Sequence, residues 1–132
     1  MVRGHHVLIV EDEPLIALDL EHALSSAGAA VNVANTVASA LEAAAAPTVT
    51  AAIVDLCLHG HSVRDVVERL AARNLPFVFY SGHMETPTAA SWPSVPFLIK
   101  PLPAGQVVDM VVRVVAVKAG AISIPSEKGG PV

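Results

Sequence analysis

Carboxylate side chains follow two short apolar segments of this chain. Glu11 and Asp12 come directly after the segment 6–10, and Asp55 closes the segment 51–55. If these segments form neighbouring strands, the three carboxyl groups meet at one edge of a sheet. Such a cluster must bind a cation or share a proton, because carboxylates in contact raise one another's pKa.

Two further polar residues stand at the ends of predicted strands. Ser81 ends the apolar segment 76–81, and Lys100 ends the segment 97–100. In open parallel sheets, ligands bind beyond the carboxyl ends of the strands, where the strand order reverses. Five polar residues at one edge of one sheet therefore indicate a functional site.

Apolar strands and helices alternate along the chain, and this alternation would position the five residues. Five short strands are predicted, at residues 6–10, 30–34, 51–55, 76–81 and 97–100. Four helices are predicted, at residues 14–27, 36–47, 62–73 and 103–118. This order implies a parallel sheet with helices on both faces, and the nearly continuous apolar strands are typical of such a doubly wound sheet.

Local signals mark the ends of several elements. Gly28 is a natural stop for the first helix, and Thr36 can cap the second. Ser62 and Asp65 match a capping box at the start of the third helix. Two prolines within 83–95 predict that any helix there is short or irregular.

Length and composition are those of one domain with a sizeable core. The chain has 132 residues, 53% of them hydrophobic. We expect a domain at 1–118 and a flexible tail at 119–132, which is rich in Gly, Pro and Ser. A net charge of −4 with only 8 Lys and Arg argues against direct nucleic-acid binding. No apolar segment reaches the roughly 18 residues of a membrane span, and the single cysteine, Cys57, is typical of the cytoplasm.

Four motifs together resemble the receiver domains of two-component response regulators, a CheY-like family. The motifs are VLIVEDEP at 7–14, IVDL at 53–56, FYSG at 79–82 and FLIKP at 97–101. The resemblance covers roughly residues 5–118, and the spacing between the motifs is close to that of the family. It implies a flavodoxin-like (βα)5 fold with strand order 2-1-3-4-5 and a reduced fourth helix.

The resemblance gives the acidic residues separate roles. Asp55 would be the nucleophile that accepts a phosphoryl group, as carboxylates do in covalent catalysis. A Mg²⁺ ion held by Glu11, Asp12, Asp55 and the backbone carbonyl of Cys57 would keep the carboxylates ionised and bind the phosphoryl oxygens.

Other residues take roles from the same resemblance. Lys100 and Ser81 would bind the phosphoryl oxygens, and Ser81 and Phe97 would form the conformational switch. His83 stands where relatives tune the hydrolysis of the phosphate. The peptide bond between Lys100 and Pro101 is cis in the family.

Some features depart from the commonest receiver pattern. The stretches from Asp55 to Ser81 and from Ser81 to Phe97 are both short, and the second shortening removes most of the fourth helix. A subgroup of alphaproteobacterial-style receivers has the motif Phe-Ala-Thr-Gly followed by an aromatic residue. In this chain Phe79 is followed by Tyr80, Ser81, Gly82 and His83 at the matching positions. We therefore expect a member of this Phe-Ala-Thr-Gly subgroup.

The leading functional hypothesis is a single-domain receiver that is phosphorylated on Asp55 and signals by protein contact. It would promote its own phosphorylation and dephosphorylation without being an enzyme in the ordinary sense. The alternative is a receiver-like docking or dimerisation module that works without phosphorylation. A metal-dependent phosphatase is a third reading, but Cys57 stands where it would need a second aspartate.

Partner surfaces are predicted on two helices. Leu15, Leu18 and His22 share a face of the first helix that suits a sensor histidine kinase or a phosphotransfer protein. Val108 and Val112 lie apart from the main apolar face of the last helix. Exposed valines there would indicate a homodimer surface or a contact with a downstream protein target.

Overall fold

The computed structural model describes residues 2–82 and 86–120. Its centre is a five-stranded sheet in the order β2-β1-β3-β6-β7, and all neighbouring strands are parallel. The strands are β1 (His6–Val10), β2 (Ala30–Ala34), β3 (Ala51–Val54), β6 (Phe77–Ser81) and β7 (Phe97–Ile99). Counted as five sheet strands, this is the predicted order 2-1-3-4-5, and the doubly wound fold is confirmed.

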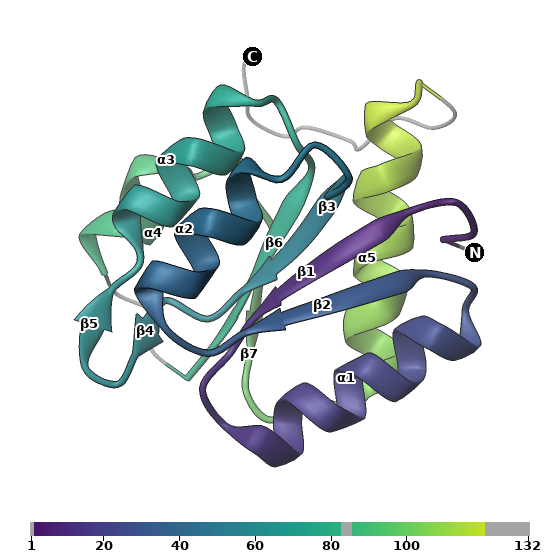
Figure 1. Cartoon of the computed structure of the whole chain (residues 1–132), viewed down its shortest axis with the longest axis horizontal. Helices are drawn as coiled ribbons and strands as arrows, with labels where there is room; N and C mark the ends of the chain where they lie inside the picture. Colours follow the sequence, from purple (N-terminus) through teal and green to yellow (C-terminus); the bar gives the residue numbers. More distant parts are fainter. Residues whose placement is uncertain (1, 83–85, 121–132) are drawn as a thin grey trace.

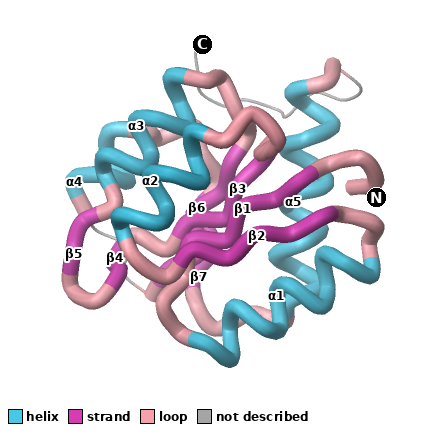
Figure 2. Tube along the Cα trace, in the orientation of Figure 1, coloured by secondary structure: helices cyan, strands magenta, loops and turns pink. Residues whose placement is uncertain are grey.

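Helices cover both faces of the sheet (Figures 1 and 2). One face carries α1 (Pro14–Ser26) and α5 (Ala104–Lys118). The other carries α2 (Val37–Ala45), α3 (Arg64–Ala72) and α4 (Pro87–Ser91). Among the described residues, no helix is both long enough and apolar enough to cross a membrane.

Two hydrophobic clusters fill the space between the sheet and its two helical layers. Adjacent residues of a strand point to opposite faces, so Leu8 and Val10 pack toward α2 and α3, while Val7 and Ile9 pack toward α1 and α5. Both sets are completely buried. This burial explains why the central strands read as continuous apolar segments in the sequence.

The expected signals for the first two helices act as predicted. Gly28 follows α1 with φ +98°, and a Cβ atom there would meet the Arg3 backbone at 3.3 Å, so glycine suits both the conformation and the space. Thr36 is the N-cap of α2 and accepts a hydrogen bond from the Ser39 amide at 3.1 Å.

The start of the third helix differs from the prediction. Val63, rather than Ser62, is the N-cap of α3, and no side chain caps the helix. Ser62 instead belongs to a small hairpin of β4 (Cys57–Leu58) and β5 (His61–Ser62) that the sequence did not predict. Its hydroxyl accepts a hydrogen bond from the Arg64 amide at 3.2 Å, so the capping-box prediction is wrong.

The hairpin turns on two residues with positive φ, His59 at +49° and Gly60 at +80°. Positive φ at both central residues defines the type I′ turn that two-residue hairpins favour. The turn residues Asn-Gly or Asp-Gly usually signal such a hairpin, and His-Gly carries no such signal. The sequence pattern therefore did not predict the hairpin.

The α5 helix lies against both α1 and the sheet. Val107, Val111, Val114 and Val115 recur at helical spacing and are buried. Val108 is also buried at 6% exposure, and Val112 is half-buried against the same cluster. The expectation of an exposed valine face is therefore wrong, because both valines pack into the hydrophobic cluster on this face of the sheet, and the dimer surface loses its basis.

Candidate functional site

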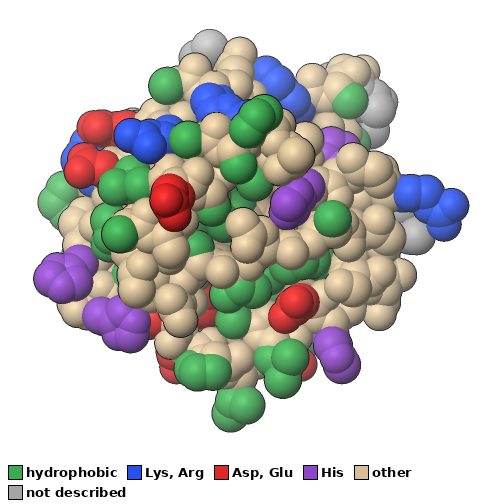
Figure 3. Space-filling view, viewed as in Figure 1, with side chains coloured by type: hydrophobic (Ala, Val, Ile, Leu, Met, Phe, Trp, Pro, Cys, Tyr) green, Lys and Arg blue, Asp and Glu red, His purple; other side chains and the backbone are tan. Residues whose placement is uncertain are grey.

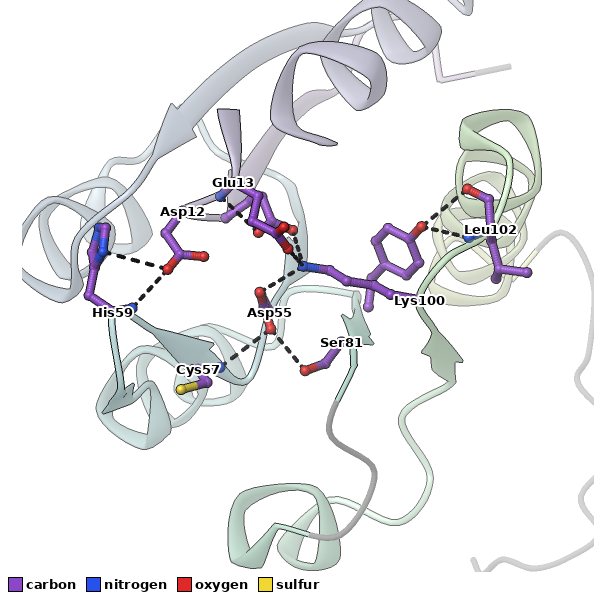
Figure 4. A network of polar contacts seen from close by, with 10 residues as sticks. Asp12, Glu13, Asp55, Cys57, His59, Ser81, Lys100 and Leu102 are labelled. Atoms are coloured by element: carbon purple, nitrogen blue, oxygen red, sulfur yellow. Dashed lines mark hydrogen bonds and ion pairs between the residues drawn. The ribbon is translucent and has the colours of Figure 1, made fainter. Parts of the chain in front are cut away.

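The carboxyl ends of four strands bring the predicted site residues together. Pairing of Val10 with Val54 places Glu11 and Asp12, which follow β1, beside Asp55, which follows β3. Pairing of β3 with β6 and of β6 with β7 brings up Ser81 and Lys100. The expected meeting of these five residues is thus a consequence of strand register, and Figure 4 shows most of them in one network.

Three carboxylates form the acidic part of the site. Glu11, Asp12 and Asp55 each offer an oxygen atom, and these atoms all lie within 4.8 Å of one another. Glu11 is 2% exposed and Asp55 is 6% exposed, whereas Asp12 is more open. Buried carboxylates at this spacing require a positive partner.

Lys100 is that partner in the described network. Its Nζ lies 2.8 Å from Glu11 Oε1 and 2.9 Å from Asp55 Oδ2. A third acid, Glu13, reaches the same Nζ through Oε1 at 3.0 Å. One ammonium group therefore uses its three donor positions on three carboxylates.

Asp55 is held through both of its carboxylate oxygens. Oδ2 faces Lys100, and Oδ1 accepts a hydrogen bond from the Ser81 hydroxyl at 2.8 Å. The Cys57 amide donates a longer hydrogen bond to the same Oδ1 at 3.4 Å. The position and orientation of this carboxylate are therefore fixed by three groups from three parts of the chain.

Asp12 is oriented by the β4–β5 hairpin. The His59 amide donates to Asp12 Oδ2 at 2.8 Å, and His59 Nδ1 lies 3.6 Å from the same oxygen (Figure 4). The type I′ turn thus points the backbone of residue 59 at the acidic cluster. The sequence carries no sign of this contact, because nothing in its pattern showed the hairpin.

Burial and hydrogen bonding act on the acids in opposite directions. Burial raises the pKa of Glu11 to about 7, although its hydrogen bond with Lys100 works against this. At Asp12, burial also acts to raise the pKa and is the largest single effect. The hydrogen bonds from the His59 amide and from the amide of Asp12 itself, with the nearby charges of His59 and Lys100, together outweigh it, so the pKa is lowered. Glu11 is therefore the carboxyl group of the cluster that can carry a proton near neutrality.

The pKa of Lys100 is also set by burial and hydrogen bonding acting in opposite directions. Burial acts to lower the pKa of its ammonium group, but the hydrogen bonds to Glu11, Asp55 and Glu13 raise it above the ordinary lysine value. The side chain therefore stays charged at every pH at which the protein would work.

A pocket of about 280 Å³ opens beside the cluster. It is lined by Asp12, Glu13, Asp55, Cys57, His59, Gly60, Gly82 and Lys100. Such a volume admits a small anionic group together with a cation, and nearly all of its polar lining belongs to the residues already described. The site is thus an open acidic pocket with one lysine beside it.

Three predicted site residues remain: Phe97, Pro101 and His83. Phe97 is half-buried, with its ring 6.0 Å from that of Phe79 on the α2–α3 face. The Lys100–Pro101 peptide bond is cis. His83 lies outside the described residues. Sequence reasoning missed the contact of Glu13 with Lys100, although Glu13 directly follows the acidic pair and could have been considered with it.

The donor set fits a hard divalent cation. Three carboxylate oxygens close together are ligands that Mg²⁺ accepts, and the partly open pocket leaves room for the water molecules that Mg²⁺ retains. Lys100 already contacts two of the three carboxylates, so a bound cation would share their charge with the ammonium group.

Fold and site together define a class of signalling domain. Its members have a doubly wound sheet with acidic residues, a hydroxyl group and a lysine at the carboxyl ends of the strands. The sequence profile of the response regulator receiver domain matches residues 7–112. Because this match covers most of the chain, the protein belongs to the response regulator receiver domain family of two-component systems. No curated protein was matched by the sequence search.

Solved structures agree with this membership. SdrG from Sphingomonas melonis Fr1 is 36% identical over 87% of this chain and 99% of its own, with a TM-score of 0.74. The PhyR receiver domain of Erythrobacter litoralis is 26% identical over 94% of this chain and 96% of its own, with a TM-score of 0.73. A CheY-like receiver protein of Methanospirillum hungatei JF-1 is 16% identical over 88% of this chain and 97% of its own. Its TM-score of 0.79 shows the shared fold alone.

Proposed function

We propose that this receiver accepts a phosphoryl group on Asp55 from the phosphohistidine of a sensor kinase or a phosphotransfer protein. An Asp55 carboxylate oxygen forms the new bond to phosphorus while the phosphorus–nitrogen bond breaks, and the histidine nitrogen keeps the electron pair. The observation that carries the proposal is the placement of Asp55 between Lys100 Nζ at 2.9 Å and Ser81 Oγ at 2.8 Å, with two further acids alongside.

The acidic cluster supports a role for Mg²⁺ in this reaction. Glu11, Asp12 and Asp55 would hold the ion together with the backbone carbonyl of Cys57. When bound, Mg²⁺ supplies positive charge to the phosphoryl oxygens. The His59 amide fixes one oxygen of Asp12, so the aspartate enters such a site already oriented.

Lys100 and Ser81 would bind the phosphoryl oxygens in place of their present contacts with Asp55. Ser81 then moves toward the phosphoryl group and Phe97 moves inward, which gives two packings of the β6–β7 edge. The half-buried position of Phe97 supports this, because part of the side chain is still exposed and can become buried. His83 would tune the lifetime of the phosphate.

Protein contact would carry the signal in and out of the domain at 1–118. The α1 residues Leu15 and Leu18 are 81% and 53% exposed, and Figure 3 shows hydrophobic side chains on the surface over the start of α1. This surface adjoins Glu13 and the acidic pocket, so it suits the kinase or phosphotransfer partner. The free thiol of Cys57 beside the site favours the reducing cytoplasm.

Phosphorylation with a small donor tests the proposal. With acetyl phosphate and Mg²⁺, we expect the intact protein to gain the mass of one phosphoryl group, and the gain to be absent in Asp55→Asn. Asp19→Asn, which changes an exposed aspartate of α1, is the matched control and should still gain the mass. An unmodified wild-type protein would overturn the proposal.

The phosphorylation-independent docking module is not favoured. Such a module needs no buried acids held by a lysine, and buried charges are costly to keep without a use. The phosphatase reading is not favoured either, because Cys57 presents a thiol where that reaction needs a second carboxylic acid.

A further inference from the structure

Tyr80 lies between the site and the α1–α5 side of the core. It precedes Ser81 on β6, and adjacent strand residues point to opposite faces. Its side chain is 3% exposed and belongs to the cluster that α1 and α5 cover. A buried tyrosine needs a hydrogen-bond partner for its hydroxyl group, so the partner of Tyr80 indicates what this side chain holds in place.

That partner is the backbone of Leu102, two residues after Lys100. The Tyr80 hydroxyl accepts a hydrogen bond from the Leu102 amide at 2.9 Å and donates one to the Leu102 carbonyl at 3.1 Å (Figure 4). Pro101 and Pro103 have no amide hydrogen, so the Leu102 amide is the one backbone donor of residues 101–103. A single phenol thus satisfies both polar groups of the residue at the centre of the loop between β7 and α5.

The ring of Tyr80 also reaches the end of the Lys100 side chain. Lys100 Nζ lies 5.8 Å from the ring centroid, within the range of an attractive cation–π contact. The same Nζ contacts Glu11 and Asp55. Tyr80 therefore restrains Lys100 in two ways. Its hydroxyl group holds Leu102, in the loop that follows Lys100, and the face of its ring contacts the Lys100 ammonium group.

We propose that Tyr80 is a positioning residue for Lys100, holding its ammonium group where the phosphoryl oxygens will lie. This inference rests on the proposed phosphorylation of Asp55. Lys100 is a long side chain with many rotamers, and a pre-positioned charge loses less freedom when the phosphoryl group arrives. Tyr80 contributes no atom to the reaction itself and acts through the lysine.

Two substitutions separate the hydroxyl group from the ring. In Tyr80→Phe the ring remains but the Leu102 amide and carbonyl lose their partner, and we expect the rate of phosphorylation by acetyl phosphate to fall roughly tenfold. In Tyr80→Leu the ring is lost as well, and the fall should be larger. Affinity for Mg²⁺ should not weaken in either variant, because Tyr80 contacts none of the three candidate ligands.

A double-mutant cycle distinguishes positioning from general destabilisation. In a Lys100→Ala background, Tyr80→Phe should change the rate less than about twofold, because the residue it positions is gone. Val78→Ala is the matched control, since Val78 is buried on the same face of the same strand and should lower stability without changing the rate. Equal slowing by Tyr80→Phe in both backgrounds, or none in either, would overturn the inference.

A measurement on unphosphorylated protein tests the positioning role of Tyr80 separately from the phosphorylation of Asp55. In unphosphorylated protein, Tyr80→Phe should speed hydrogen exchange at the Leu102 amide and broaden the NMR signal of the Lys100 ammonium group. If the wild-type protein takes up no phosphoryl group, the proposed function fails while these signals still decide the positioning role. An unchanged Lys100 signal in Tyr80→Phe would sink that role whatever the phosphorylation result.

Discussion

At the scale of single residues, Glu11 has the most unusual environment in the site. It is 2% exposed, and burial raises its pKa to about 7 even though Lys100 Nζ lies 2.8 Å away. A protonated Glu11 cannot serve as a metal ligand, because carboxylate ligands must be ionised. Metal binding at this site should therefore be linked to the proton on Glu11.

This linkage predicts the pH dependence of Mg²⁺ binding. Below about pH 7, each pH unit should weaken Mg²⁺ binding by roughly tenfold, because one proton must leave Glu11. Above that pH the affinity should level off. Titration calorimetry or Trp92 fluorescence at several pH values would measure it. An affinity that is flat between pH 5 and 8 would contradict the assignment of the proton to Glu11.

In the metal-free protein, the proton on Glu11 should make the free energy of unfolding depend on pH. The pKa of Glu11 is raised in the fold from 4.5 to about 7, so the folded state binds more protons than the unfolded state between these values. The contribution of Glu11 is therefore fully present below about pH 4.5 and is lost as pH rises to about 7. Urea unfolding should show this fall in wild type and in the exposed-residue control Glu42→Gln, but a reduced fall in Glu11→Gln.

At the scale of elements, arginines at the two ends of α3 connect this helix to α2 and α4. Arg73 Nη1 donates to the carbonyls of Ala44 at 2.8 Å and Ala46 at 2.9 Å, which lie at the end of α2. The last carbonyls of a helix have no partner within it, and a cation there also compensates the helix dipole. The guanidinium of Arg73, the residue that directly follows α3, thus takes the place of a C-terminal cap for α2.

We expect Arg73→Lys to lower the free energy of unfolding by about 1–2 kcal/mol, since a single ammonium group cannot reproduce the forked contacts of half-buried Arg73. Chemical denaturation would measure the loss. Arg69→Lys is the matched control, because Arg69 is exposed and makes one longer hydrogen bond, to the Leu41 carbonyl at 3.2 Å. A larger loss in Arg69→Lys than in Arg73→Lys would refute this ranking.

A second arginine ties the short α4 helix to α3. Arg64 Nη2 donates to the Pro87 carbonyl at 3.1 Å and to Ser91 Oγ at 2.9 Å. Its guanidinium also lies 5.5 Å from the centroid of the Trp92 ring. A five-residue helix is too short to be stable on its own, so these contacts are a main support of α4.

Removing this support should loosen α4 and leave the rest of the fold in place. In Arg64→Ala we expect faster amide exchange over 86–92 and altered Trp92 fluorescence, with a global stability change below about 1 kcal/mol because the lost contacts are largely exposed. Arg69→Ala, on the same helix, should leave Trp92 unchanged. Identical exchange rates in wild type and Arg64→Ala would show that α4 holds its place without the arginine.

At the scale of the whole molecule, the sequence predicted the strands of the sheet and missed the β4–β5 hairpin and the burial of Val108. The central strands β1, β3 and β6 appear as apolar segments because both of their faces are covered, and the register of β1 with β3 then fixes the meeting of Glu11 and Asp55. The β4–β5 hairpin has strands of two residues each, too short for any periodic signal. The burial of Val108 depends on how α5 packs into the shared hydrophobic cluster, which helical periodicity within α5 cannot show.

The acidic cluster joins strands that are far apart along the chain, so a cation bound there should stabilise the entire fold. The ligands come together only in the folded state, and binding to that state alone adds about 1.4 kcal/mol for each tenfold rise in Mg²⁺ above its dissociation constant. We therefore expect the urea midpoint at pH 8 to rise steadily with Mg²⁺. Asp12→Asn, which removes one candidate ligand, should flatten the rise, and NaCl at equal ionic strength should not reproduce it. If NaCl raised the midpoint as much as Mg²⁺ did, general screening of the net negative charge would explain the effect, and no specific cation site would be needed.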